Sequence, residues 1–137
     1  MKNIILDSEA ISQLARSKGK GAQGIVQDAI RAAATVGAPV IVPAAVLAEQ
    51  YRGGSHDQLV DACLSRYPGI EIENTTRSLA RSIGNILGRA KLGSEHHVDA
   101  AVIATATARG GGVILTSDPD DLERLAAGNS AITIVAI

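Results

Sequence analysis

The sequence predicts the α/β fold class, with a parallel sheet that helices cover on both faces. Short runs of β-branched residues alternate along the chain with longer segments of helical period, which is the pattern of strands joined by crossover helices. The chain has 137 residues, which is the usual size of one domain and too few for two independent cores. We therefore expect residues 1–137 to form a single domain.

Five short apolar runs are the expected strands, and turn signals separate them. Gly37-Ala38-Pro39 precedes the second run, Pro68-Gly69 the third, and the glycines at 110–112 open the fourth. In chain order the expected strands are residues 3–6, 40–42, 70–73, 112–116 and 132–136.

The segments between these runs have the spacing of helices, apart from residues 17–24. That segment holds Lys18, Lys20 and three glycines, which predicts a mobile loop with a small basic patch beside Arg16. Pro43 marks the start of the third helix, because proline is favoured in a first helical turn. The expected helices are residues 8–16, 23–36, 44–52, 57–66, 76–91, 95–109 and 120–127.

The amino-acid composition excludes some classes of function and indicates the cellular compartment. Two tyrosines are the only aromatic residues, so the chain lacks the stacking platforms by which many proteins hold single-stranded bases. The formal charge of -1 leaves room only for a local basic patch. A lone Cys63 cannot form an intramolecular disulfide, and no apolar stretch is long enough for a signal peptide or a membrane span. We expect a cytoplasmic protein without membrane contact.

Two acidic residues follow expected strands directly. Asp7 follows the first strand and Asp118 follows the fourth, and ligands of open α/β sheets bind outside the carboxyl ends of the strands. Each residue also fits a purely structural role as a helix N-cap, Asp118 especially, because Pro119 would then occupy the first helical position.

Two further acidic residues lie on expected helices. Asp99 precedes Val102 by three residues and Ile103 by four, which places its carboxylate on the side that those residues bury. Glu49 lies at the edge of the apolar stripe of its helix, where an ion pair with Arg52 is the simpler explanation.

If these four carboxylates converge, their mutual repulsion raises their pKa values unless a cation lies between them. Oxygen ligands suit Mg²⁺ or Mn²⁺, and the chain lacks the cysteine and histidine spacing of a zinc site. Such an ion lowers the pKa of bound water and stabilises charge on a leaving oxygen, which is the chemistry of phosphodiester hydrolysis.

Four motifs together resemble the PIN domain, and more narrowly the VapC-type toxin ribonucleases. Their order along the chain carries the resemblance: Asn3-Ile-Ile-Leu-Asp7-Ser8, Pro43-Ala-Ala-Val-Leu-Ala-Glu49, Asp99-Ala-Ala-Val-Ile-Ala-Thr105-Ala, and Val113-Ile-Leu-Thr116-Ser-Asp118-Pro-Asp-Asp121-Leu. The resemblance implies a three-layer α/β/α fold with a central, mostly parallel five-stranded sheet. It also implies an Mg²⁺-dependent endoribonuclease in which Mn²⁺ can substitute, a separately encoded antitoxin and a homodimer.

The resemblance also implies roles for individual residues. Catalytic residues would be Asp7, Glu49, Asp99 and Asp118, of which Asp7, Asp99 and Asp118 would bind the metal. Ser8, Thr116 and Asp121 would support these or serve as alternatives. A cap of the first helix is the favoured explanation for Ser8, and Thr116 is equally explained as an ordinary residue at a strand end. Asp121 is the alternative to Asp118 because the acidic run 118–121 offers a choice of ligand.

The histidine pair and the basic helix are open to simpler explanations. His96 and His97 precede Asp99, but adjacent helical residues point about 100° apart, so a solvated first turn explains them better than a shared ion. A segment without acidic residues could contact RNA or an antitoxin, or be an ordinary solvated surface; its cations are Arg77, Arg81, Arg89 and Lys91.

The alternative class is a non-catalytic signalling or interaction module. A phosphoacceptor receiver would resemble this chain in size and fold, but it requires an acidic pair after the first strand, whereas Asp7 is followed by Ser8. An inactive PIN-like module, with the four acidic residues serving as caps and ion pairs, is the other alternative.

Overall fold

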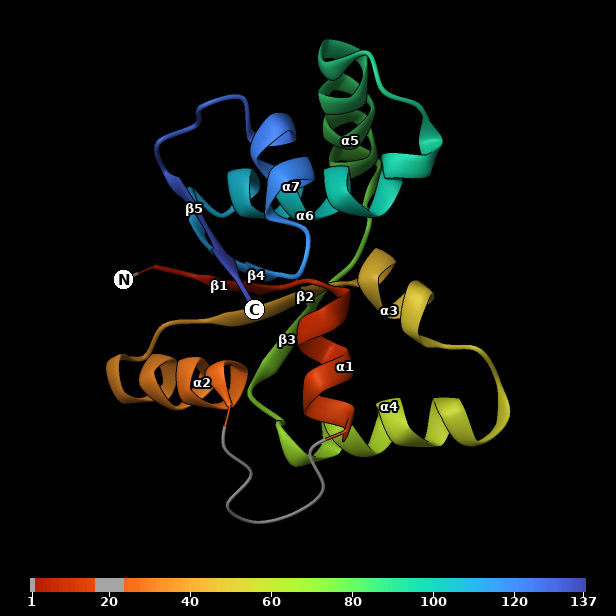
Figure 1. Cartoon of the computed structure of the whole chain (residues 1–137), viewed down its shortest axis with the longest axis vertical. Helices are drawn as coiled ribbons and strands as arrows, with labels where there is room; N and C mark the ends of the chain where they lie inside the picture. The colour runs from red at the N-terminus through yellow and green to blue at the C-terminus, as the bar shows by residue number, and fades with distance from the viewer. Residues whose placement is uncertain (1, 17–23) are drawn as a thin grey trace.

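A computed structural model describes residues 2–16 and 24–137 of the chain, so most of the expected loop at 17–24, including Lys18 and Lys20, lies outside the described residues. The described chain forms a five-stranded sheet in which every pairing is parallel, in the order β3-β2-β1-β4-β5 (Figure 1). The strands are β1 (Ile4–Leu6), β2 (Val40–Pro43), β3 (Ile70–Glu73), β4 (Gly112–Thr116) and β5 (Ile132–Ala136).

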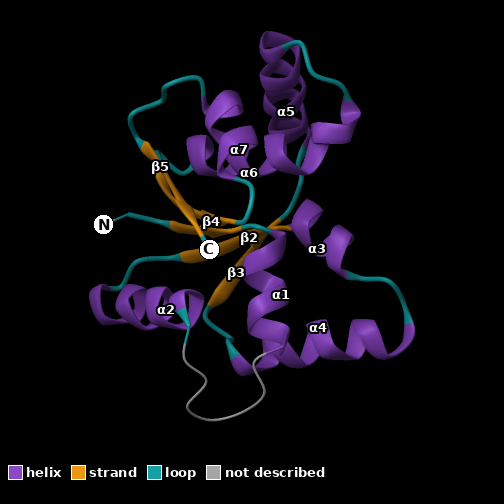
Figure 2. Ribbon diagram, viewed as in Figure 1, coloured by secondary structure: helices purple, strands orange, loops and turns teal. Residues whose placement is uncertain are grey.

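Helices cover both faces of this sheet, which confirms the three-layer α/β/α fold (Figure 2). On one face lie α1 (Ser8–Arg16), α2 (Ile25–Val36) and α4 (Gly54–Arg66), and on the other α5 (Arg77–Ala90), α6 (His97–Ala108) and α7 (Pro119–Ala126). The short α3 (Ala44–Gln50) contacts α1 and α6 beside the sheet. Right-handed crossovers produce this division, because the strand order reverses between β1 and β4.

The reversal of strand order determines where a site can form. β1 and β4 are neighbours in the sheet, yet their connections lead to opposite faces. At such a switch point the loops that follow the two strands separate and leave a crevice at the carboxyl edge. Asp7 follows β1 and Asp118 follows β4, so both lie at this position.

The predicted strands differ from the observed ones by at most one residue at an end, but three helices needed correction. The helix expected at 57–66 begins at Gly54, because the Asp57 carboxylate accepts hydrogen bonds from the backbone N–H groups of Arg52 and Gly53 and so stabilises an earlier first turn. The helix expected at 44–52 ends at Gln50, where the chain becomes extended. The segment expected as one helix at 95–109 contains a separate 3₁₀ turn, Ser94–His96, before α6.

An aliphatic core surrounds α6, the most buried helix. Every residue from 100 to 106 is buried, and small alanine side chains let the helix lie between the sheet and α5 and α7. Beyond the carboxyl end of α6, the start of β4 lies so close to the residue before β1 that a Cβ on Gly112 would lie 2.7 Å from the carbonyl oxygen of Asn3. None of the described helices combines the length and apolar character needed to cross a bilayer.

Candidate active site

Asp7 is buried at the edge of the sheet where the strands end, directly after the central strand β1. It is only 6% exposed. One carboxylate oxygen accepts a hydrogen bond from the Ser8 backbone N–H at 2.8 Å, and the other accepts one from the Thr116 hydroxyl at 2.7 Å. Burial raises the pKa of Asp7, and the charges of Glu49 and Asp118 raise it further, whereas the two hydrogen bonds lower it.

Thr116 connects the ends of β1 and β4. Its buried hydroxyl donates to Asp7 and also accepts a hydrogen bond from the backbone N–H of Asp118 at 3.0 Å. Asp118 is the N-cap residue of α7, followed by Pro119 in the first turn as expected. Its side chain makes no capping hydrogen bond, so the exposed carboxylate is not explained by the cap alone.

Glu49 reaches the site through Ser8. The Ser8 hydroxyl donates to a Glu49 carboxylate oxygen at 2.5 Å, and the Gln50 side chain donates to the Ser8 carbonyl at 3.1 Å, which holds α3 against the start of α1. The simpler explanation for Glu49, an ion pair with Arg52, is wrong, because the Arg52 guanidinium donates to the carbonyl oxygens of Ala48 and Tyr51. The Ser8 hydroxyl therefore bonds a side chain of another helix.

Asp99 enters the site from the first turn of α6. The pKa of Asp99 is raised to about 6, chiefly by burial and also by the charges of Asp7, Asp118 and Asp121, while the charge of His96 lowers it. The sequence argument placed Asp99 on a buried side of an amphipathic helix, but this helix is buried on every side along its middle. Asp99 is instead set apart by its place at the helix start, which opens on the crevice.

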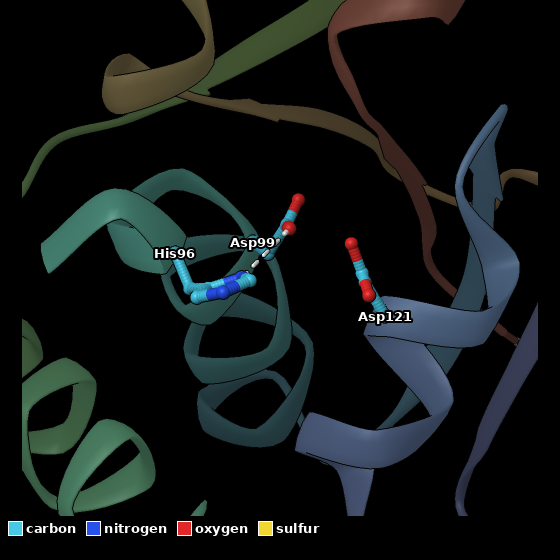
Figure 3. A group of neighbouring side chains, drawn as sticks. All are labelled: His96, Asp99 and Asp121. Carbon is cyan, nitrogen blue, oxygen red and sulfur yellow. Dashed lines mark ion pairs between the residues drawn. The ribbon is translucent and has the colours of Figure 1, made fainter. Parts of the chain in front are cut away.

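His96 and Asp121 lie beside Asp99 (Figure 3). His96 Nδ1 lies 4.0 Å from Asp99 Oδ2, and one ligand atom from each of the three residues lies within 4.8 Å of the others. A solvated first turn was the wrong explanation for His96, whose side chain is 22% exposed, while it fits the exposed His97. The signal in the sequence was the three-residue spacing between His96 and Asp99.

Apart from His96 beside Asp99, the described part of the chain brings little positive charge to the acidic cluster. Within the described residues, no lysine or arginine forms an ion pair with Asp7, Glu49, Asp99 or Asp118, and only Asp121 has one, with Arg124 at 3.5 Å. Raised pKa values at Asp7 and Asp99 are the consequence of burial and crowding. Oxygen ligands with a raised affinity for positive charge fit a hard divalent cation, while the only cysteine is buried in α4.

The basic residues of α5 are all exposed, and no described residue forms an ion pair with them. Arg77 begins the helix, and Arg89 lies about 18 Å farther along the helix axis. Lys91 follows the last turn as its C-cap. The positive charge is therefore distributed along α5 in two pairs, of which Arg77 and Arg81 lie at the end nearer β3.

Comparisons with known proteins agree with this fold. A family model described as the PIN domain matches residues 4–128. The chain is similar to a crystal structure of VapBC2 from Rickettsia felis bound to a DNA fragment from their promoter, with TM-score 0.69, 13% identity and 98% of each chain covered. It is also similar to a toxin-antitoxin complex from Klebsiella pneumoniae, with TM-score 0.66, 15% identity, and 98% of this chain and 100% of that chain covered. The comparison with curated proteins finds no match.

Proposed function

The chain belongs to the PIN domain family, and from that premise we propose that it is an Mg²⁺-dependent endoribonuclease and the toxin of a toxin-antitoxin pair. One observation carries the proposal: the buried Asp7 and the charge of Asp118 both raise the pKa of Asp99, and no described lysine or arginine forms an ion pair with any of the three. Fixed carboxylates that repel one another are costly to the fold, and a divalent cation removes that cost.

We assign Asp7, Asp99 and Asp118 as the residues that hold the ion, with Mn²⁺ able to replace Mg²⁺. A bound ion would supply a water of lowered pKa and would stabilise the charge that develops on the phosphodiester. Glu49 is exposed at the rim and oriented by Ser8, so it is placed to accept a proton from water. Thr116 orients Asp7, and Asp121 supports Asp99 from α7.

The remaining roles concern positioning of the nucleic acid. The basic residues of α5 would contact phosphates, which fixes the position of a strand without reading its sequence. Arg77 and Arg81 are the stronger candidates, because they lie near the end of β3 at the same edge of the sheet as Asp7, whereas Arg89 and Lys91 lie at the far end of the helix.

A protein partner follows from the two solved structures, both of which are toxin-antitoxin assemblies. We propose that a separately encoded antitoxin blocks this site, and that the toxin forms a homodimer. A blocking segment must bring positive charge, because the rim of the site carries the exposed carboxylates of Glu49 and Asp118.

The test is cleavage of a pool of structured RNAs by purified, antitoxin-free protein, with Mg²⁺ or Mn²⁺ compared with EDTA. Discrete cuts that require both the metal and Asp7, with Asp7→Asn as the control, are the expected result. Absence of cleavage together with absence of metal binding by calorimetry would contradict the proposal and favour a non-catalytic PIN-like module.

A further inference from the structure

His96 is directed at Asp99 by the way α6 begins. The 3₁₀ turn Ser94–His96 ends at His96, which is the N-cap of α6, and Asp99 is the third residue of that helix. Residues at the N-cap and at the third helical position face each other, as the reciprocal contacts of a capping box show. The side chain of His96 therefore faces the carboxylate cluster (Figure 3).

The contacts of His96 within the described residues are two long ion pairs, with Asp99 and with Glu95. Its side chain makes no capping hydrogen bond. Nδ1 lies 4.0 Å from Asp99 and Nε2 lies 3.9 Å from Glu95, both beyond hydrogen-bond distance. A partly buried imidazole thus lies beside Asp99 and Asp121 without a direct bond to either.

The spacing suits a shared ion. Two ligands on opposite sides of an ion at about 2.1 Å lie about 4.2 Å apart, and ligands at right angles lie closer. The ligand atoms of His96, Asp99 and Asp121 lie within 4.8 Å of one another, so a movement of about half an ångström allows all three to bind one ion.

We propose that His96 is a nitrogen ligand of the cation at this site and that it shifts the preference of the site from Mg²⁺ toward Mn²⁺ and other transition metals. The proposal rests on the metal site of the proposed function: it shares Asp99 with that site and adds His96, with Asp121, the alternative to Asp118, as the neighbouring ligand. Imidazole suits transition metals, whereas Mg²⁺ prefers oxygen, so one nitrogen among carboxylates changes selectivity more than total affinity. His97, adjacent in sequence but exposed, is the matched control.

The experiment is pulsed electron paramagnetic resonance of Mn²⁺ bound to the full chain. We expect ¹⁴N modulation from a directly bound imidazole. Labelling the histidines with ¹⁵N should change this modulation in the unsubstituted protein, and that control does not depend on the folding of any variant. The modulation should persist in His97→Gln and His56→Gln and disappear in His96→Gln. Competition titrations should show that His96→Gln lowers the affinity for Mn²⁺ relative to Mg²⁺ by at least about tenfold.

The possible outcomes distinguish the proposed role of His96 from the proposed metal site and nuclease function. Bound Mn²⁺ without nitrogen modulation, with an unchanged Mn²⁺ to Mg²⁺ ratio in His96→Gln, would overturn the role of His96 and leave the carboxylate site intact. Failure of the unsubstituted protein to bind either ion, together with absence of metal-dependent cleavage, would overturn both proposals. Persistence of the modulation in folded His96→Gln would assign the nitrogen to another residue and overturn this one.

Discussion

Acidic residues lie at both ends of α6, in contrasting surroundings: Asp99 on the helix itself, and Glu71 and Glu73 on the neighbouring β3. At the carboxyl end, Arg109 lies 3.1 Å from Glu71 and 3.0 Å from Glu73, and the hydrogen bond with Glu73 is the main cause that raises the pKa of Arg109. At the amino end, Asp99 has the charges of Asp7 and Asp118 close by, and no described lysine or arginine pairs with any of the three.

The difference shows how a structural ion pair is distinguished from a site that needs a ligand. The helix dipole favours an acidic residue at the amino end of a helix and a basic residue at its carboxyl end. Asp99 and Arg109 therefore both stabilise α6. The charges differ, because Arg109 compensates part of the negative charge of Glu71 and Glu73 within the chain. The cluster around Asp99 has no such partner among the described lysines and arginines, so its excess of negative charge is left for a bound cation to compensate.

The largest expected effect is the loss of cleavage in Asp99→Asn. This change keeps the size of the side chain but removes its charge, so we expect RNA cleavage to fall on the order of 100- to 1000-fold. Glu73→Gln, which changes the partner of Arg109 at the carboxyl end of the same helix, should leave cleavage unchanged. Single-turnover rates measure both variants, and full activity of Asp99→Asn in a nuclease-free preparation would remove Asp99 from the site.

The second effect is stabilisation by metal. An ion present at 100 times its dissociation constant stabilises the folded chain by about 2.7 kcal/mol, so Mn²⁺ should raise the Tm of the unsubstituted protein by several degrees. EDTA should reverse the increase, and Asp99→Asn should largely abolish it. Differential scanning calorimetry tests this, and equal shifts in the two proteins would place metal binding elsewhere.

The third effect is a dependence of stability on pH that arises at the amino end of α6. The pKa of Asp99 is about 6 in the folded chain, against 3.8 as the ordinary value of an aspartate, so the folded state binds the proton more tightly and its stability falls as pH rises through that window. Without metal, Asp99→Asn should therefore be more stable than the unsubstituted protein at pH 7.5, by on the order of 1–3 kcal/mol.

The control at the other end is Glu73→Gln, which should lower stability at pH 7.5 by less than about 1 kcal/mol, because Arg109 keeps Glu71 as a partner. Urea denaturation at pH 7.5 and at pH 3.5 measures both variants. The gain of Asp99→Asn should vanish at the lower pH, and a gain that persists there would show that its cause is not the charge of Asp99.

The smallest effect concerns the unpaired cations of α5. Replacement of Arg77 and Arg81 by glutamine should weaken RNA binding a few-fold and lower the slope of log affinity against log salt by about 1.4, the value for two phosphate contacts on a single strand. Binding is measured in the Asp7→Asn background to prevent cleavage, with Arg31→Gln on α2 as the control. An unaltered slope would make this end of α5 an ordinary solvated surface.

The sequence alone placed two members of the site. Asp7 and Asp118 directly follow apolar runs of a βαβ pattern, and parallel strands must end at one edge of their sheet, so their proximity follows from the fold class. Asp99 was identified for the wrong reason, because helical periodicity cannot distinguish faces on a helix that is buried on every side.

Only the tertiary structure decided which side chains meet across elements. The Ser8 hydroxyl bonds Glu49 because α3 packs beside α1, Arg52 turns away to backbone carbonyls, and a 3₁₀ turn directs His96 toward Asp99. Spacing along the chain determines the direction of a side chain within its own helix or strand, but the docking of those elements determines its neighbours. The unbalanced charge of the site is a property of that docking, since the whole chain carries nearly equal numbers of acidic and basic residues.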